Sequence, residues 1–174
     1  ARNREDWWER FMALLDRGCR LVQLRPPPGL FDDLPAVAQR AAGLCLERGA
    51  TLVLNGPVSL VRRLDLPGVH LPSRVLMSLQ ERPVSVARLA GASCHSAGEL
   101  DQAVHLGLDY ALLSPVRETP SHPGAPVLGM TSFARFAGPC PLPVFALGGM
   151  SPGDLEAVLD AGGHGVAGIS AFWD

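Results

Sequence analysis

The stretch VFALGGMSPGDLEAVLDAGGHGVAGIS, residues 144–170, contains the pattern that decides the fold. Its two short apolar runs, 144–147 and 165–169, have the length and composition of buried strands. Between them, Ser151 is a suitable helix N-cap and Pro152 a suitable first helical residue, so we predict a helix over 152–160. A strand, a helix and a second strand in this order predict two parallel strands joined by a right-handed crossover.

The same alternation continues outward along almost the whole chain. A first helix is predicted from the helical spacing of Trp7, Trp8, Phe11, Leu14 and Leu15, and Gly18 ends it. Further strands are predicted at 20–24, 51–54, 68–71, 89–93 and 110–113. Further helices are predicted at about 33–47, 58–64, 75–80, 97–106 and 131–137.

Seven strands separated by helices indicate an α/β fold, for which two architectures compete. One is an open doubly wound sheet, and the other is a closed barrel. Neither a dinucleotide-binding glycine motif nor a P-loop follows the first strand, which favours the barrel. We therefore predict one domain, residues 1–174, that forms most of a (β/α)8 TIM barrel. A complete barrel has eight strands, so its first strand and last helix are expected to be missing or truncated in this chain.

Composition excludes several classes of partner. The 174 residues are 47% hydrophobic and carry a net charge of −2, without a basic run of the kind that binds nucleic acid. No apolar stretch is long enough for a membrane helix, so neither nucleic acid nor membrane is expected as a partner. The four cysteines show no metal-ligand spacing and lie in apolar surroundings, which predicts reduced core thiols in a cytoplasmic protein.

Polar or glycine residues occur repeatedly where the predicted strands end. In a parallel barrel the C-terminal strand ends meet on one face, so we expect these residues to converge on one pocket. They are Gln23, Arg25, Asn55, His70, Ser93, His95, Ser114, Gly148, Gly149 and Ser170.

The last two strand ends favour a phosphate site. Gly148 and Gly149 lie between a strand and a helix, and Ser170 ends the next strand. Glycines let backbone N–H groups approach an anion, helix N-termini favour anions, and barrels often hold phosphate between their last two strand ends. We predict a phosphate site formed by the backbone of these three residues.

Eight segments of the chain resemble the thiamine-phosphate synthase and thiazole tautomerase family. Val22–Arg25 resembles its VQLR strand, Leu52–Asn55 its LLIN strand, and Gly68–Leu71 matches GVHL. The remaining segments match the family patterns GxSxHS, GPVFxT, GAPPLG, VAIGGI and VAVISA, in this order; they begin at Gly91, Ser114, Gly124, Phe145 and Val166. Together these segments cover nearly the whole chain.

The resemblance implies transfer of a hydroxymethylpyrimidine group from its diphosphate to a thiazole phosphate. It implies Gln23 and Arg25 at the pyrimidine diphosphate, with Asn55 and Ser93 at the same substrate or its leaving group. Thr119 and Ser121 would line the thiazole end. Gly149, Ile169 and Ser170 would hold the thiazole phosphate, with Gly148 beside them. Arg25, Ser93 and His122 are the catalytic candidates; His122 stands where the family has a lysine.

The sequence departs from the family pattern at the metal site. Gly56 follows Asn55 where the family has an aspartate, and residues 72–75 read Pro-Ser-Arg-Val where acids are usual. Magnesium normally requires one or two carboxylates in such sites. We therefore predict no tightly bound metal or cofactor, and magnesium only when a diphosphate substrate brings it. Pro27 also replaces a family lysine.

Two other functions stay open. A thiazole tautomerase needs an acid–base group but no metal, and His95, His122 and Glu118 are candidates, although Pro115 stands where the tautomerase has a histidine. The third possibility is a non-catalytic binding domain, because the loop 121–126 and the lost acids resemble versions fused behind a Nudix hydrolase domain. An upstream Nudix domain would agree with the start at Ala1. Homodimers are common among such barrels, and the sequence does not decide this point.

Overall fold

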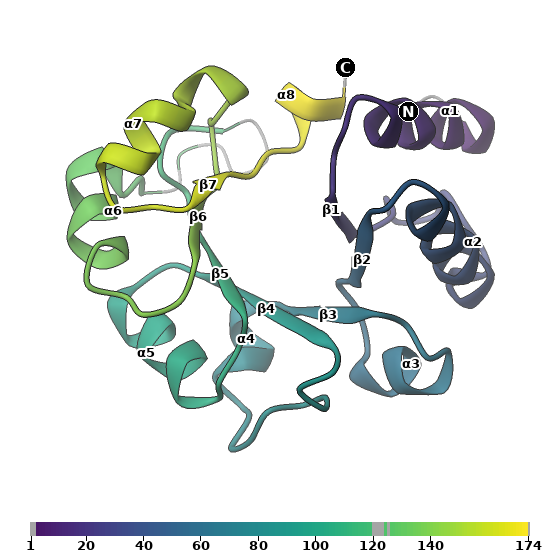
Figure 1. The fold of residues 1–174 in the computed structure, drawn as a ribbon, viewed down its shortest axis with the longest axis horizontal. Helices are drawn as coiled ribbons and strands as arrows, with labels where there is room; N and C mark the ends of the chain where they lie inside the picture. Colours follow the sequence, from purple (N-terminus) through teal and green to yellow (C-terminus); the bar gives the residue numbers. More distant parts are fainter. Residues whose placement is uncertain (1–2, 120–123, 125, 174) are drawn as a thin grey trace. The chain divides into compact units, whose positions relative to one another are not determined.

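The computed structural model describes residues 3–119, 124 and 126–173 (Figure 1). Its internal contacts divide the chain into two compact units. Unit 1 contains residues 3–70, 83–90 and Trp173. Unit 2 contains residues 71–82 and the described part of 91–172.

Unit 1 begins with alternating helices and parallel strands. They are, in chain order, α1 (Arg4–Asp16), β1 (Leu21–Leu24), α2 (Leu34–Glu47), β2 (Thr51–Leu54), α3 (Val58–Arg63) and β3 (Gly68–Leu71), whose last residue, Leu71, belongs to unit 2. Strand β2 pairs in parallel with β1, with Leu21 opposite Thr51 and Leu24 opposite Leu54, and it also pairs with β3. Helix α2 packs on β1 and β2.

The first helix of unit 1 is held by aromatic packing. Trp7, Trp8 and Phe11 are buried, and Trp7 stacks on Phe11 with a centroid distance of 5.2 Å. The edge of Trp7 also faces Phe31, which belongs to the loop after β1. This cluster fixes α1 against the β1–α2 connection, so the predicted apolar face of the first helix is confirmed.

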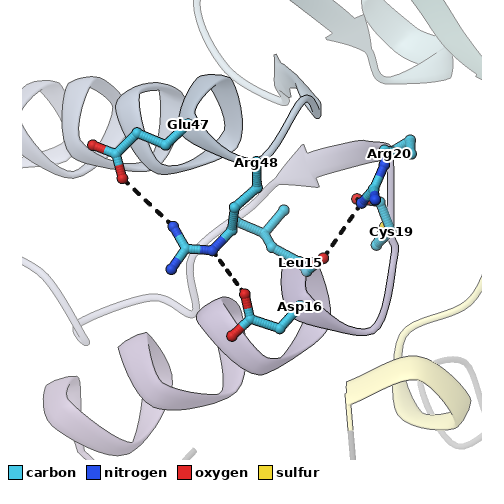
Figure 2. A network of polar contacts seen from close by, with 6 residues as sticks. All are labelled: Leu15, Asp16, Cys19, Arg20, Glu47 and Arg48. Atoms are coloured by element: carbon cyan, nitrogen blue, oxygen red, sulfur yellow. Dashed lines mark hydrogen bonds and ion pairs between the residues drawn. The ribbon is translucent and has the colours of Figure 1, made fainter.

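The C-terminal ends of α1 and α2 are joined by Arg48. Its Nε donates to Asp16 Oδ1 at 2.8 Å, and Nη1 lies 3.5 Å from a carboxylate oxygen of Glu47 (Figure 2). Close by, Arg20 donates to the Leu15 carbonyl, one of the last carbonyls of α1. These cations bind acceptors at helix C-termini, where positive charge is favourable.

Unit 2 continues the same alternation. Its elements are α4 (Ser73–Leu76), β4 (Leu89–Cys94), α5 (Ala97–His105), β5 (Tyr110–Leu113), α6 (Gly129–Ala137), β6 (Val144–Ala146), the 3-10 turn η1 (Pro152–Asp154), α7 (Leu155–Asp160), β7 (Gly165–Val166) and α8 (Ser170–Trp173). The first two residues of β4, Leu89 and Ala90, and the last residue of α8, Trp173, belong to unit 1. Strands β4, β5, β6 and β7 pair in parallel in chain order, with Gly91 opposite Tyr110 and Ala146 opposite Val166.

Three predicted elements differ from the observed ones by more than two residues at one end. The strand predicted at 165–169 contains two residues, because the chain turns after Ala167 toward the short helix α8. The helix predicted at 152–160 is divided into η1 and α7, and in the first turn the Asp154 backbone N–H donates to the Ser151 carbonyl three residues earlier. The short helix predicted at 75–80 lies at Ser73–Leu76, where the Pro72 carbonyl accepts from Val75 and Leu76.

The four cysteines are free thiols, as predicted. Burial raises the pKa of both Cys45 and Cys94 to about 12, which keeps them protonated. Cys19 and Cys140 are only half-buried, so the prediction of four core residues is wrong for these two. No helix within the described residues combines the length and apolarity needed to cross a bilayer.

Candidate functional site

In unit 1, Gln23 and Asn55 come together at neighbouring strand ends. The Asn55 side-chain Nδ2 donates to Gln23 Oε1 at 2.9 Å, and the Asn55 backbone N–H donates to the Leu24 carbonyl. Gln23 is placed by the pleat of β1, since Val22 and Leu24 on either side of it are buried. This hydrogen bond does not use the Gln23 NH₂ group or the Asn55 carbonyl oxygen, so the pair offers both a donor and an acceptor.

Two further predicted strand-end residues of unit 1, Arg25 and His70, differ in exposure. Arg25 is exposed just after β1, whereas His70 is fully buried in β3. Burial, and then the nearby charge of Arg25, lower the pKa of His70 to about 4. The ring is therefore neutral at pH 7, and a buried neutral imidazole fits a structural role better than proton transfer.

In unit 2, the His95 ring contacts the loop after β5. Its Nδ1 lies 2.7 Å from the Ser114 carbonyl oxygen, which can only accept, so the tautomer that makes this hydrogen bond carries its proton on Nδ1 and has Nε2 as the acceptor. The His95 backbone N–H donates to Glu99 Oε2 at 2.5 Å, and the Ser73 hydroxyl donates to the other Glu99 oxygen at 2.7 Å. Half-buried Ser93 lies two residues earlier, in β4.

Sequence reasoning missed the roles of Ser73 and Glu99. A signal was available, since Ser96 and Glu99 have the spacing of a capping box. The Ser96 hydroxyl does accept from the Glu99 backbone N–H, at 3.3 Å. The Glu99 carboxylate, however, reaches back to His95 rather than to the N-cap residue itself.

The glycine pair after β6 packs directly on the loop after β5. The backbone N–H groups of Val116 and Arg117 donate to the carbonyls of Leu147 and Gly148, at 2.9 and 3.0 Å. Gly149 has a φ of +64°, and a Cβ there would lie 2.5 Å from the Glu118 carbonyl oxygen. A side chain is therefore excluded by both conformation and space.

An ion pair between Arg117 and Asp154 links the loop after β5 to the segment that follows the glycine turn. Asp154 accepts from both the Ser151 backbone N–H (2.9 Å) and the Ser151 hydroxyl (2.8 Å), and Arg117 Nη1 donates to its other oxygen at 2.7 Å. The Ser151 hydrogen bonds, together with Arg117, hold the pKa of the Asp154 carboxyl below its usual value. Ser151 and Asp154 show capping-box spacing in the sequence, whereas the contact with Arg117 joins residues 37 apart and was not predicted.

The remaining predicted site residues fall in unit 2 or outside the described residues. Strands β6 and β7 are paired, so the glycine turn and the segment leading to Ile169 and Ser170 leave adjacent strand ends. Ile169 and Ser170 are exposed, and Thr119 is half-buried. Ser121 and His122 lie outside the described residues.

The predicted site residues therefore form two groups, one in each unit. The group in unit 1 contains Gln23, Arg25 and Asn55. The group in unit 2 contains Ser93, Thr119, Gly148, Gly149, Ile169 and Ser170. The convergence of both groups on one pocket stays a prediction.

The donor set does not fit the magnesium ion that the family resemblance suggests. Gly56, which has no side chain, follows Asn55, and Ser73 donates its hydroxyl proton to Glu99. Within the part of the chain that the structure describes, no cluster of three or more His, Cys, Asp or Glu side chains could hold a metal.

A surface groove of about 410 Å³ in unit 1 lies apart from these residues. Arg4, Trp8, Phe31, Asp32 and Arg40 are among its lining residues. Its cations are already engaged, since Arg4 pairs with Asp32, and Arg40 lies over the Trp8 ring at 4.2 Å. The groove therefore offers no unpaired cation for a ligand among the residues named, and the strand-end residues are the better candidates for the site.

This chain resembles thiamine-phosphate synthases. The family model described as thiamine monophosphate synthase matches residues 1–172. A thiamine-phosphate synthase of Synechococcus sp. (strain CC9605) is 35% identical over 173 residues, which are 97% of this chain and 48% of that protein. A thiamine-phosphate synthase of Bacteroides thetaiotaomicron is 30% identical over 172 residues, covering 95% of this chain and 82% of that protein.

The fold is shared with a solved structure, a thiamine phosphate pyrophosphorylase from Pyrococcus furiosus. The TM-score is 0.75 at 22% sequence identity, covering 92% of this chain and 77% of that chain. Together with parallel strands that alternate with helices in chain order, this likeness confirms the predicted α/β TIM-barrel fold. The chain spans about half the length of the Synechococcus relative.

Proposed function

Because the chain belongs to the thiamine monophosphate synthase family, we propose that it binds a thiazole phosphate or a similar small phosphorylated heterocycle and transfers a pyrimidine group to it. The reaction would serve thiamine biosynthesis or salvage. The Synechococcus and Bacteroides relatives carry the name of this transferase, which supports the proposal.

The observation that carries the proposal is the glycine turn after β6. Gly148 and Gly149 both have positive φ, and the loop after β5 packs against them so closely that side chains are excluded. Such a turn exposes backbone N–H groups at short range to an anion. A phosphate monoester is the ligand group that this arrangement suits best.

The group in unit 1 supplies complementary chemistry for a pyrimidine diphosphate. The amide pair of Gln23 and Asn55 offers a donor and an acceptor, which an aminopyrimidine ring requires. Arg25 is exposed beside this pair, and its guanidinium matches diphosphate oxygens. In the reaction, the thiazole nitrogen forms a bond to the pyrimidine methylene carbon while the carbon–oxygen bond to diphosphate breaks. Arg25 would stabilise the electron pair that leaves with the diphosphate.

A specific observation also favours a second function, a thiazole tautomerase. In the His95 tautomer that hydrogen-bonds to the Ser114 carbonyl, Nδ1 donates and Nε2 is the acceptor. A neutral imidazole held in this way can remove a proton from a carbon and return it elsewhere on the ring. Glu99 would hold the loop that carries His95.

One set of assays distinguishes these functions. The purified chain receives both synthase substrates with magnesium, and thiamine phosphate is measured; separately, it receives the thiazole phosphate tautomer alone. We expect product in the first assay, and Arg25→Gln should reduce it at least tenfold, whereas His95→Gln should not. Turnover only in the second assay, lost in His95→Gln, would instead support the tautomerase. Binding without turnover in either would leave the binding-domain function.

A matched pair of variants tests the glycine turn itself. Gly149→Asp adds a negative charge to the turn and forces its side chain against the Glu118 carbonyl and Arg117, so calorimetry should detect no binding of thiazole phosphate. Gly153→Asp adds the same charge four residues later, at an exposed position whose nearest neighbour is 3.7 Å from a new Cβ. Equal affinity in Gly149→Asp and wild type would refute the phosphate site.

A further inference from the structure

Arg117 begins directly above the glycine turn. Its backbone N–H donates to the Gly148 carbonyl at 3.0 Å, and its Cβ lies 2.8 Å from the position a Cβ on Gly149 would occupy. The side chain therefore leaves the loop after β5 beside the glycine turn. It is 46% exposed, so a ligand can reach it.

The guanidinium of Arg117 is held at one end. Nη1 donates to Asp154 Oδ1 at 2.7 Å, and Asp154 is itself held by two hydrogen bonds from Ser151. The Asp154 side chain is only 17% exposed, so it is the more fixed partner of the pair. Among the described residues, Asp154 is the acceptor for this guanidinium, and the contact uses Nη1, so the donors on Nε and Nη2 can bind a ligand.

The negative charge of Asp154 also requires a cation near the glycine turn if a phosphate is to bind there. Asp154 is ionised at neutral pH and lies beside the turn, so a dianionic phosphate placed there without Arg117 would be repelled. With Arg117 in place, the carboxylate is neutralised and the fork of the guanidinium is oriented for a second acceptor.

We propose that Arg117 determines specificity for a phosphorylated ligand by binding a phosphate oxygen at the glycine turn, with Asp154 as its positioning residue. This inference rests on the proposed function, because it assumes that the turn binds the phosphate of a small heterocycle. It goes further in assigning a side-chain cation to a site otherwise made of backbone. No covalent step is involved.

The test measures binding of two probes, thiazole phosphate and the corresponding thiazole alcohol, to the 174-residue chain by calorimetry. Arg117→Ala should weaken binding of the phosphate about 10- to 100-fold, as expected for loss of a charge-assisted hydrogen bond. Binding of the alcohol should change less than about twofold, because it has no phosphate to contact. Arg117→Lys keeps the charge but loses the fork, and should fall between the two.

Two further variants separate binding from a structural role. Arg135→Ala removes an exposed cation of α6 and should bind the phosphate like wild type. Arg117→Ala combined with Asp154→Asn should bind the phosphate more tightly than Arg117→Ala alone, because the unpaired carboxylate is gone. Loss of merely structural support would not be relieved in this way.

The outcomes are distinguishable. Wild-type affinity for the phosphate in Arg117→Ala, or an equal loss for phosphate and alcohol, overturns the inference and leaves the proposed function intact. If wild type does not bind thiazole phosphate, or Gly149→Asp binds it as well as wild type, the proposed function fails and the inference with it.

Discussion

At the scale of single residues, Gly149 is the position where backbone conformation and close packing require the same residue. Its φ is +64°, and the Glu118 carbonyl oxygen and Arg117 Cβ would both lie within 2.8 Å of a new Cβ. The loops after β5 and β6 can approach one another only because this residue has no side chain. The proposed phosphate site depends on that approach.

We expect Gly149→Ala to destabilise the protein by about 1–3 kcal/mol, because it adds left-handed strain and a steric clash. Gly153→Ala, whose φ is not positive and whose nearest neighbour lies 3.7 Å away, serves as the control and should change stability by less than about 0.5 kcal/mol. Urea denaturation measures both. Equal stability of the two variants would show that the turn adapts to a side chain.

His70 is the residue whose titration should be visible in the stability of the whole chain. Its pKa of about 4 in the folded protein is below the value of 6.5 for an exposed histidine, so between these pH values the unfolded chain binds more protons. Stability should therefore fall as the pH is lowered from about 6.5 to 4. The difference between the pKa values corresponds to about 3 kcal/mol.

The measurement compares the pH dependence of urea denaturation in wild type and His70→Gln. The variant should lack most of the decrease between pH 6.5 and 4. Val69→Ala removes apolar atoms from the same strand without changing a titratable group, and it should keep the wild-type slope. A slope that is unchanged in His70→Gln would mean that other groups dominate this pH range.

At the scale of elements, α2 shows how local sequence sets a helix. Asp33 is its N-cap and accepts from the Ala36 backbone N–H at 3.0 Å, and a proline occupies the first turn. Val37, Ala38, Ala41 and Cys45 form its buried face. Gly43 is the weak position, since it lies in the helix interior, is exposed, and would bring a new Cβ within 4 Å of nothing.

Gly43→Ala should therefore stabilise the protein by about 0.5–1 kcal/mol, because alanine loses less backbone entropy than glycine in a helix. Thermal unfolding would detect this as a higher Tm. A lower Tm for Gly43→Ala would contradict the helix assignment at this position.

Gly91→Ala in β4 should have the opposite effect on Tm. A new Cβ there would lie 2.0 Å from the Tyr110 ring, and overpacking should cost about 1–3 kcal/mol.

At the scale of the whole molecule, the question is what the chain binds. The chain matches the family model over residues 1–172, yet neither Gly56 nor residues 72–75 supply the carboxylates that a magnesium site needs. We propose that magnesium binds to this protein only as a complex with a diphosphate.

Millimolar magnesium chloride should therefore change the Tm of the ligand-free chain by less than about 1 °C, since an ion that does not bind the folded state does not stabilise it. The same magnesium concentration together with a pyrimidine diphosphate should raise the Tm above the value with diphosphate alone. A concentration-dependent rise with magnesium by itself, reversed by a chelator, would refute the prediction and indicate a protein-bound metal.

The type and order of the helices and strands could be predicted from the sequence alone. The strands at Thr51–Leu54, Gly68–Leu71 and Tyr110–Leu113 have the predicted bounds, because short apolar runs bounded by turn residues are a local property of the chain. The glycine pair could also be placed at a strand end, because glycine and proline act on their own backbone. The predicted bounds were wrong at β7 and α7, because β7 extends only as far as its pairing with β6 and the first turn before α7 is a 3-10 turn.

Tertiary structure decided which polar groups meet. Asn55 donates to Gln23 across 32 residues of sequence, and Arg117 reaches Asp154 across 37, and no periodicity encodes either distance. The same holds for His70, whose neutral state follows from burial and from the neighbouring Arg25. Side-chain patterns act within a turn of helix or a few strand residues, whereas hydrogen bonds and charges depend on the distances that packing creates between remote segments.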